Sequence, residues 1–115
     1  MRPIRVSAIS FLNTAPLLWD FEHGEPRPEF RLEYTVPSAC AEQLRAGAVD
    51  VGIIPVVAYH NIPELVVIPE VAIATKRTVR SIVLVSKVPM DEIRSIAADT
   101  SSRTSVMLAR LLFRK

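Results

Sequence analysis

Hydroxyl-bearing residues crowd one short segment, residues 99–105, which reads Asp-Thr-Ser-Ser-Arg-Thr-Ser. An apolar run precedes this segment and a helical pattern follows it, so we expect it to join a strand to a helix. Free backbone N–H groups at a helix start, together with hydroxyls, attract carboxylates and phosphates. The same residue types also cap helices routinely. Anion binding and helix capping are both open for five residues of the segment: Ser101, Ser102, Arg103, Thr104 and Ser105.

A second group of uncharged residues follows the predicted strands, and it includes Asn13, whose alternative role is an Asx-turn that starts a helix. In a parallel α/β sheet, ligands bind outside the carboxyl ends of the strands. We therefore expect a ligand site formed by the residues at these ends, together with Val56: Ser10, Asn13, Thr14, Ser38, Pro55 and Ser86.

The other reactive side chains favour structural roles. Cys40 is the only cysteine, which excludes an intrachain disulfide and a cysteine-based zinc site, and we expect it to be buried. His23 and His60 each lack a second ligand at helical spacing, so we expect no metal. The basic residues Lys76, Arg77 and Arg80 lie in a polar turn and are typical of a solvated cluster. No nucleotide-binding or catalytic-triad motif is present, and we expect no cofactor.

The pattern of the first half predicts alternating strands and helices. Strands are expected over 6–12, 31–36 and 49–54, and helices from Pro16 to about 23 and over 39–46. Gly47 lies where a helix commonly ends, and Pro55 stops the third strand. The order β-α-β-α-β implies parallel strands joined by right-handed crossovers.

The second half predicts two further strands, a short β-α unit and a domain boundary. Residues 66–74 and 81–86 are rich in Val, Ile and Leu around a polar turn, so we expect five strands in one mainly parallel sheet. A short strand over 96–99 and a helix over 102–113 follow, and this helix is apolar nearly all round, which predicts that it is covered. We expect residues 1–88 to form a first α/β lobe, and residues 89–115 to form a hinge and the first β-α unit of an incomplete second lobe. Residues 95–115 are expected to pack away from the sheet or on a partner chain.

Charge and hydropathy exclude several classes of partner. Lys and Arg number 14 against 12 Asp and Glu, a net charge of +2, and no long basic run occurs, so nucleic acid is not expected. The amino terminus has no signal-peptide core, and no apolar stretch reaches the roughly 18 residues of a membrane span. We expect a cytoplasmic protein without a membrane partner.

Three stretches stand out: residues 9–17 (Ile-Ser-Phe-Leu-Asn-Thr-Ala-Pro-Leu), residues 47–55 (Gly-Ala-Val-Asp-Val-Gly-Ile-Ile-Pro) and the segment 99–105. Together they resemble the chorismate dehydratase family of the futalosine route to menaquinone. The middle stretch also resembles many periplasmic-binding-protein-like domains, whereas the other two are specific. The resemblance implies a periplasmic-binding-protein-like type 2 fold, with two α/β lobes around a ligand cleft.

The resemblance also implies a reaction. A dehydratase of this family is a lyase that eliminates water from chorismate to give 3-[(1-carboxyvinyl)oxy]benzoate, without a cofactor. It implies that Asn13 is catalytic and orients a substrate carboxylate or the leaving hydroxyl, while Ser86 holds the other end. No His, Glu or Lys lies in the candidate loops, so a substrate carboxylate is expected to take the proton.

Other functions share this fold. The related dihydroxynaphthoate synthase is one, although the stretch from Phe11 to Asn13 favours the dehydratase. A solute-binding protein would need an export signal. A ligand-sensing domain of a transcription regulator would need a DNA-binding helix-turn-helix ahead of Met1.

Overall fold

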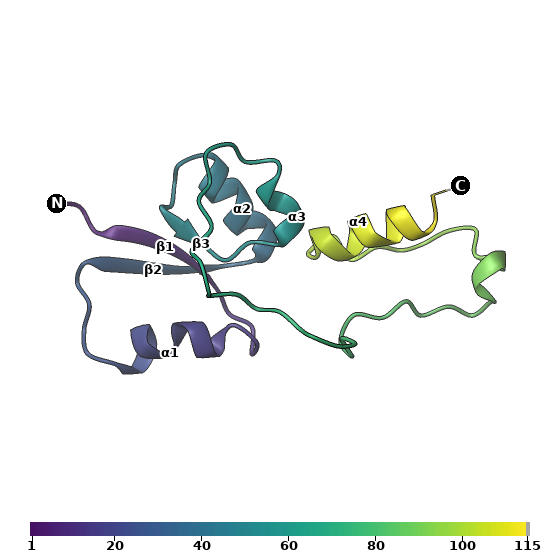
Figure 1. Cartoon of the computed structure of the whole chain (residues 1–115), viewed down its shortest axis with the longest axis horizontal. Coiled ribbons are helices and arrows are strands. Elements are labelled where there is room, and N and C mark those ends of the chain that lie inside the picture. The colour runs from purple at the N-terminus through teal and green to yellow at the C-terminus, as the bar shows by residue number, and fades with distance from the viewer. Residues whose placement is uncertain (115) are drawn as a thin grey trace.

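A computed structural model describes residues 1–114 of the chain as a mixed α/β structure with a small parallel sheet (Figure 1). A 3₁₀ helix, Met90–Glu92, follows the long irregular segment after α3. The strands and α-helices, in chain order, are β1 (Ile4–Ile9), α1 (Ala15–His23), β2 (Phe30–Thr35), α2 (Pro37–Arg45), β3 (Val51–Gly52), α3 (Val56–Tyr59) and α4 (Arg103–Leu112).

The sheet has the strand order β2-β1-β3, and both pairings are parallel. Ile9 is paired with Thr35 of β2, and Ser7 is paired with Gly52 of β3. The chain steps from β1 to one side and then back across β1 to the other, so right-handed crossovers place α1 and α2 on opposite faces. Figure 1 shows α1 below the sheet and α2 above it. The predicted β-α-β-α-β order is therefore confirmed.

The core forms where α2 packs on β1 and β3. The predicted burial of Cys40 is confirmed, because its side chain is fully buried and faces the backbone of Ser7, with 3.7 Å between Sγ and the carbonyl oxygen. Burial raises the pKa of the Cys40 thiol, which keeps it protonated and unreactive. The buried Ser7 hydroxyl donates to Gln43 Oε1 at 2.7 Å. Gly47 lies just past α2 with φ of 65°, as its predicted place at a helix end requires.

Three predicted strands do not form in the structure. Residues 66–74, 81–86 and 96–99 are irregular, and the first two follow a long excursion away from the sheet in Figure 1. Their Val, Ile and Leu content expresses a preference for a pleated, half-buried surface, but a strand also needs a hydrogen-bonded neighbour. Val66 and Val85 are instead 89% and 86% exposed. Within residues 1–114 the sheet has three strands, not five, and β3 covers only part of the predicted range 49–54.

Helix α4 forms almost as predicted, but only one of its faces is covered. One side packs on α3, while Leu108, Leu111 and Leu112 remain at least half exposed. Within residues 1–114 this helix is therefore covered on one side, and the expectation that its other apolar faces are covered stays a prediction. The lobe boundary at residue 88 stays a prediction.

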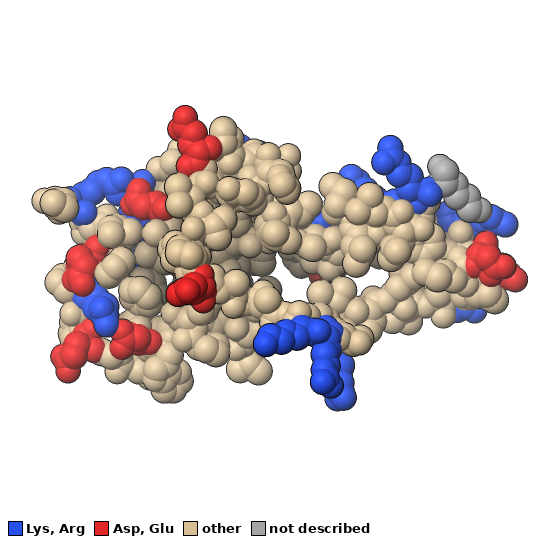
Figure 2. All heavy atoms as spheres, in the orientation of Figure 1, with Lys and Arg blue, Asp and Glu red and all other residues tan. Residues whose placement is uncertain are grey.

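The edge of the sheet at the amino ends of the strands is fastened by one carboxylate. Asp50 accepts two hydrogen bonds from the guanidinium of Arg2, at 2.6 and 2.8 Å. It also accepts hydrogen bonds from the Arg5 guanidinium and from the Arg5 backbone N–H, the latter at 2.9 Å. On the face shown in Figure 2, acidic and basic side chains mix around the sheet, while basic side chains project from the irregular segment between α3 and the 3₁₀ helix, called here the extended segment. Asp50 thus joins the start of β1 to the loop before β3.

The hydrogen bonds of Asp50 with Arg2 and Arg5 make the stability of the fold depend on pH in the acid range. The hydrogen bonds from Arg2 and then Arg5 hold the pKa of Asp50 far below its usual value. The stabilisation is therefore complete above the unfolded-state pKa of about 4 and is lost as pH falls below it. We expect Asp50→Asn to lower the Tm at pH 7, with the gap to wild type closing as the pH drops from about 4 towards 2. Thermal melts across this range test it. Glu33→Gln, which removes an exposed partner of Arg31, should leave the Tm unchanged, and a pH-independent effect of Asp50→Asn would contradict the account.

Candidate functional site

The loop between β1 and α1 is shaped by a buried threonine. Thr14 is 2% exposed, and its hydroxyl lies within hydrogen-bonding distance of the carbonyl oxygens of Ile9 and Phe11, the latter at 2.6 Å. The Thr14 hydroxyl oxygen also accepts a hydrogen bond from the Phe11 N–H, at 3.3 Å. Thr14 therefore fixes the backbone of the loop, while Ser10 and Asn13 are exposed.

The structure does not support a capping role for Asn13. The residue that flanks the start of α1 is Thr14, and it forms no side-chain cap bond. Within residues 1–114 the Asn13 side chain has no hydrogen bond of the Asx-turn type. Its amide is left with both donor and acceptor groups at the carboxyl end of the central strand.

The strand register brings five of the predicted site residues to one edge of the sheet. Because β1, β2 and β3 run parallel, the residues after Ile9, Thr35 and Gly52 all leave the sheet at the same edge. Ser38, in the first turn of α2, and Pro55, just before α3, are both half-buried there. This edge thus gathers Ser10, Asn13, Thr14, Ser38 and Pro55, and none of their side chains is charged.

Ser86 does not join this group through a strand, because the strand predicted to end at it does not form. It lies exposed in the extended segment. Its hydroxyl accepts the N–H of Val88 at 3.2 Å and donates to the Val88 carbonyl at 2.8 Å. Ser86 therefore forms a local turn.

The segment 99–105 folds into a capped helix start. Ser102 accepts a bond from the Ser105 N–H at 3.4 Å and donates to the Ser105 hydroxyl at 2.7 Å. Asp99 accepts bonds from the hydroxyl and the N–H of Ser101, at 2.7 and 2.9 Å, which lower the pKa of its carboxyl. Thr104 is exposed. The capping alternative is therefore realised by Ser102, while anion binding by the segment stays a prediction.

Arg103 ties this segment to the sheet-bearing half of the molecule. Its guanidinium donates to Glu42 Oε1 on α2 at 2.6 Å, and the two side chains are only partly exposed. This bond lowers the pKa of Glu42, with a further contribution from Arg45. The bond holds the start of α4 against α2 and α3.

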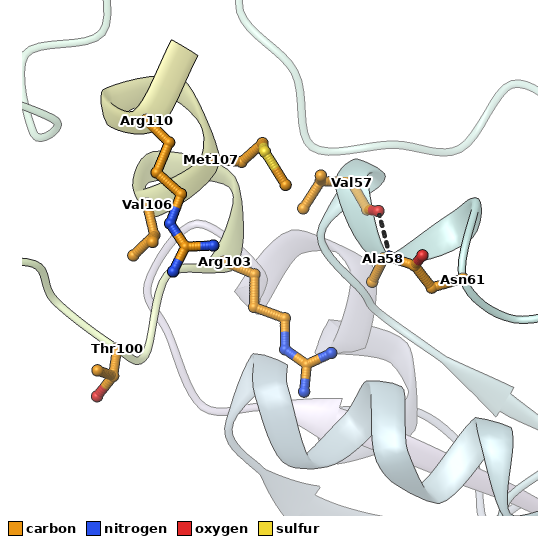
Figure 3. Close-up of a pocket in the computed structure, with 8 residues that line it drawn as sticks. All are labelled: Val57, Ala58, Asn61, Thr100, Arg103, Val106, Met107 and Arg110. Atoms are coloured by element: carbon orange, nitrogen blue, oxygen red, sulfur yellow. Dashed lines mark hydrogen bonds between the residues drawn. The ribbon is translucent and has the colours of Figure 1, made fainter. Parts of the chain in front are cut away.

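A cavity of about 280 Å³ lies between α3 and α4 (Figure 3). Of the predicted site residues, only Arg103 lines it. Its other lining residues were missed in the sequence: Val57, Ala58, Asn61, Thr100, Val106, Met107 and Arg110. A signal for part of this set exists, because positions 103, 106, 107 and 110 have the spacing of one helix face.

Residues 4–115 match a protein family described as menaquinone biosynthesis. The chain belongs to the menaquinone biosynthesis family. The match spans all three stretches that carry the resemblance noted above, and the resemblance is confirmed at this level. No solved structure matches the chain with significance.

None of the helices within residues 1–114 is long and apolar enough to cross a membrane. The same residues contain no group of three or more His, Cys, Asp or Glu side chains placed to hold a metal ion.

Proposed function

We propose that the protein is a chorismate dehydratase, a lyase that eliminates water from chorismate to give 3-[(1-carboxyvinyl)oxy]benzoate in the futalosine route to menaquinone. Membership of the menaquinone biosynthesis family supports the pathway. The observation that carries the proposal is the loop after β1, where Thr14 fixes the backbone and leaves Asn13 exposed at the carboxyl edge of the sheet. The proposal includes a cytoplasmic setting and a periplasmic-binding-protein-like type 2 fold, in which residues 1–88 form the first lobe.

The chemistry asked of the protein is positioning. A ring proton and a hydroxyl leave chorismate as water, and the ring becomes aromatic, which drives the reaction. The uncharged edge of the sheet offers no side-chain base, so a substrate carboxylate takes the ring proton. The Asn13 amide both donates and accepts hydrogen bonds, and it orients that carboxylate or the departing hydroxyl.

The second carboxylate of chorismate is bound by hydroxyls and backbone N–H groups. Ser38 and the segment 101–105 both lie at helix starts, where the helix dipole favours negative charge. Pairing an anion with neutral donors avoids burying a cation beside it. Arg103 is paired with Glu42, and the Asp99 carboxylate already accepts the N–H and the hydroxyl of Ser101. The donors of this segment that remain for a substrate carboxylate are therefore those of residues 102–105.

We expect the double variant Ser102→Ala, Thr104→Ala to weaken chorismate binding by about 2–3 kcal/mol, at about 1–1.5 kcal/mol for each lost neutral hydrogen bond. Calorimetric titration of the full-length protein with chorismate measures the effect. Loss of the Ser102 cap alone costs stability of about 0.5–2 kcal/mol, so a variant with lower Tm and unchanged affinity would assign the segment to capping only.

The elimination itself is tested by following chorismate in the presence of the full-length protein by proton NMR. The proposal predicts that the ring signals of chorismate give way to aromatic signals at a rate proportional to protein concentration. A chorismate spectrum that decays only at its protein-free rate would argue against it.

A further inference from the structure

The cavity between α3 and α4 has apolar walls and a positive charge. Val57, Ala58 and Met107 supply apolar surface, while Arg103 and Arg110 supply two guanidinium groups. No Asp or Glu is among its lining residues. Its volume of about 280 Å³ is just below the roughly 300–1,000 Å³ of typical ligand sites, which suits a small molecule. Such a cavity favours a small anion over a neutral or cationic molecule, because its guanidinium groups attract negative charge and no lining carboxylate opposes them.

The two guanidinium groups are placed by helix geometry. Arg103 and Arg110 are seven residues apart, so they lie on one face of α4, separated by about 10 Å along the axis. Figure 3 shows the Arg110 side chain running from α4 towards that of Arg103. Val106 and Met107 lie on the helix between them, and both also line the cavity.

Arg103 and Arg110 differ in whether a carboxylate already pairs with them. Arg103 is paired with Glu42 at 2.6 Å. In residues 1–114, no carboxylate lies within ion-pair distance of Arg110. Because a guanidinium has five N–H donors, Arg103 retains donors beyond its bond to Glu42, but its charge is offset. Arg110 is therefore the cation with charge to spare beside this cavity.

We propose that this cavity binds a small carboxylate with an apolar body, and that Arg110 pairs with the carboxylate while the wall formed by Val57 and Met107 covers the body. No residue of the loop between β1 and α1 lines the cavity. The site thus goes beyond the proposed function, with Arg103 as the residue that the two share.

The test uses benzoate and benzyl alcohol as probes, since the two have the same ring and differ in charge. In full-length protein labelled with ¹³C-methyl methionine, benzoate should shift the Met107 signal in a saturable way. The fully exposed Met1 and Met90, which lines a separate groove, should not respond with the same dissociation constant. The Met107 signal is assigned with Met107→Leu.

Benzyl alcohol should bind at least about 10-fold more weakly than benzoate, as expected for loss of a charge-assisted hydrogen bond. Equal affinity for the two probes, or no Met107 shift with benzoate, would overturn the proposal.

Removing the charge of Arg110 tests whether this residue pairs with the benzoate carboxylate. Arg110→Gln keeps most of the side-chain length and should weaken benzoate binding about 10-fold, while the matched control Arg31→Gln on β2 should bind benzoate like wild type. Benzoate affinity that is unchanged in folded Arg110→Gln would overturn the assignment of Arg110. If that variant does not fold, the wild-type comparison of the two probes still decides. Asn13→Ala should keep benzoate binding, so a failure of the dehydratase proposal and a failure of this one are told apart.

Discussion

Replacement of Asn13 by alanine is expected to abolish turnover of chorismate while leaving the Tm nearly unchanged. The side chain is exposed and contributes no cap bond to α1, so its loss removes little folding free energy. Removing one oriented amide donor from a site that stabilises developing charge costs on the order of 10²–10³-fold in kcat, and more if the amide also places the proton-accepting carboxylate. Steady-state kinetics with chorismate, together with thermal melts, measure both effects.

The matched control is Leu12→Ala, because Leu12 belongs to the same loop and is 92% exposed. It should retain activity and stability. If Asn13→Ala kept most of its activity but lost about 0.5–2 kcal/mol of stability, the residue would have the role of a helix cap, and the assignment of the catalytic amide would be wrong.

Gly52→Ala is expected to destabilise the fold by about 1–3 kcal/mol, the usual cost of overpacking a well-packed core. A Cβ at this position would lie 2.6 Å from Cys40 Sγ and 2.9 Å from Leu44 Cδ1. The Leu44 methyl group can rotate away, but the Cys40 side chain is fully buried between α2 and β1. Gly52 therefore allows α2 to approach β3. Denaturant unfolding measures the change.

Two further variants separate crowding from backbone strain. Combining Gly52→Ala with Cys40→Ala removes the nearest clashing atom, so the pair should be more stable than the sum of the single effects predicts. Gly47→Ala meets no atom within 4 Å but has φ of 65°, so it should cost about 1–2 kcal/mol from backbone strain and gain nothing from Cys40→Ala. Strict additivity of Gly52→Ala and Cys40→Ala would contradict the crowding explanation.

The local pattern predicts the elements from β1 to β3 well because each of them carries its own signals, whereas α3, directly after Pro55, was not predicted. Pro16 and Pro37 lie at the starts of α1 and α2, and Gly47 lies just past the end of α2. The apolar run of β1 is long enough to identify the central strand. These signals are short-range, so they can be read without knowing what packs against what.

The strands predicted over 66–74 and 81–86 are wrong because residue composition indicates β preference but not whether a segment pairs with a neighbouring strand. The segments around Ile68 and Val83 have strong β preference, but both residues are more than half exposed, and neither segment pairs with the sheet. Pairing is a long-range property that residue types in one segment do not specify. The prediction of five strands assumed that every apolar, β-branched run finds a neighbour.

The candidate site, like the fold, was predictable from the sequence only in part. Residues directly after β1 could be predicted, since the edge where parallel strands end is known once their order is known. The roles within the loop could not, because the pattern treats Thr14 and Asn13 alike, whereas one is buried in backbone hydrogen bonds and the other is exposed. The cavity beside Arg110 depends on the contact between α3 and α4, which no local pattern encodes.

The most direct test of the central claim is to incubate the full-length protein with chorismate and analyse the products by mass spectrometry. The account predicts a product lighter than chorismate by one water, formed in proportion to the protein and absent with Asn13→Ala at the same concentration. Chorismate recovered unchanged from the folded wild-type protein, or an equal yield of the dehydrated product with Asn13→Ala, would contradict it.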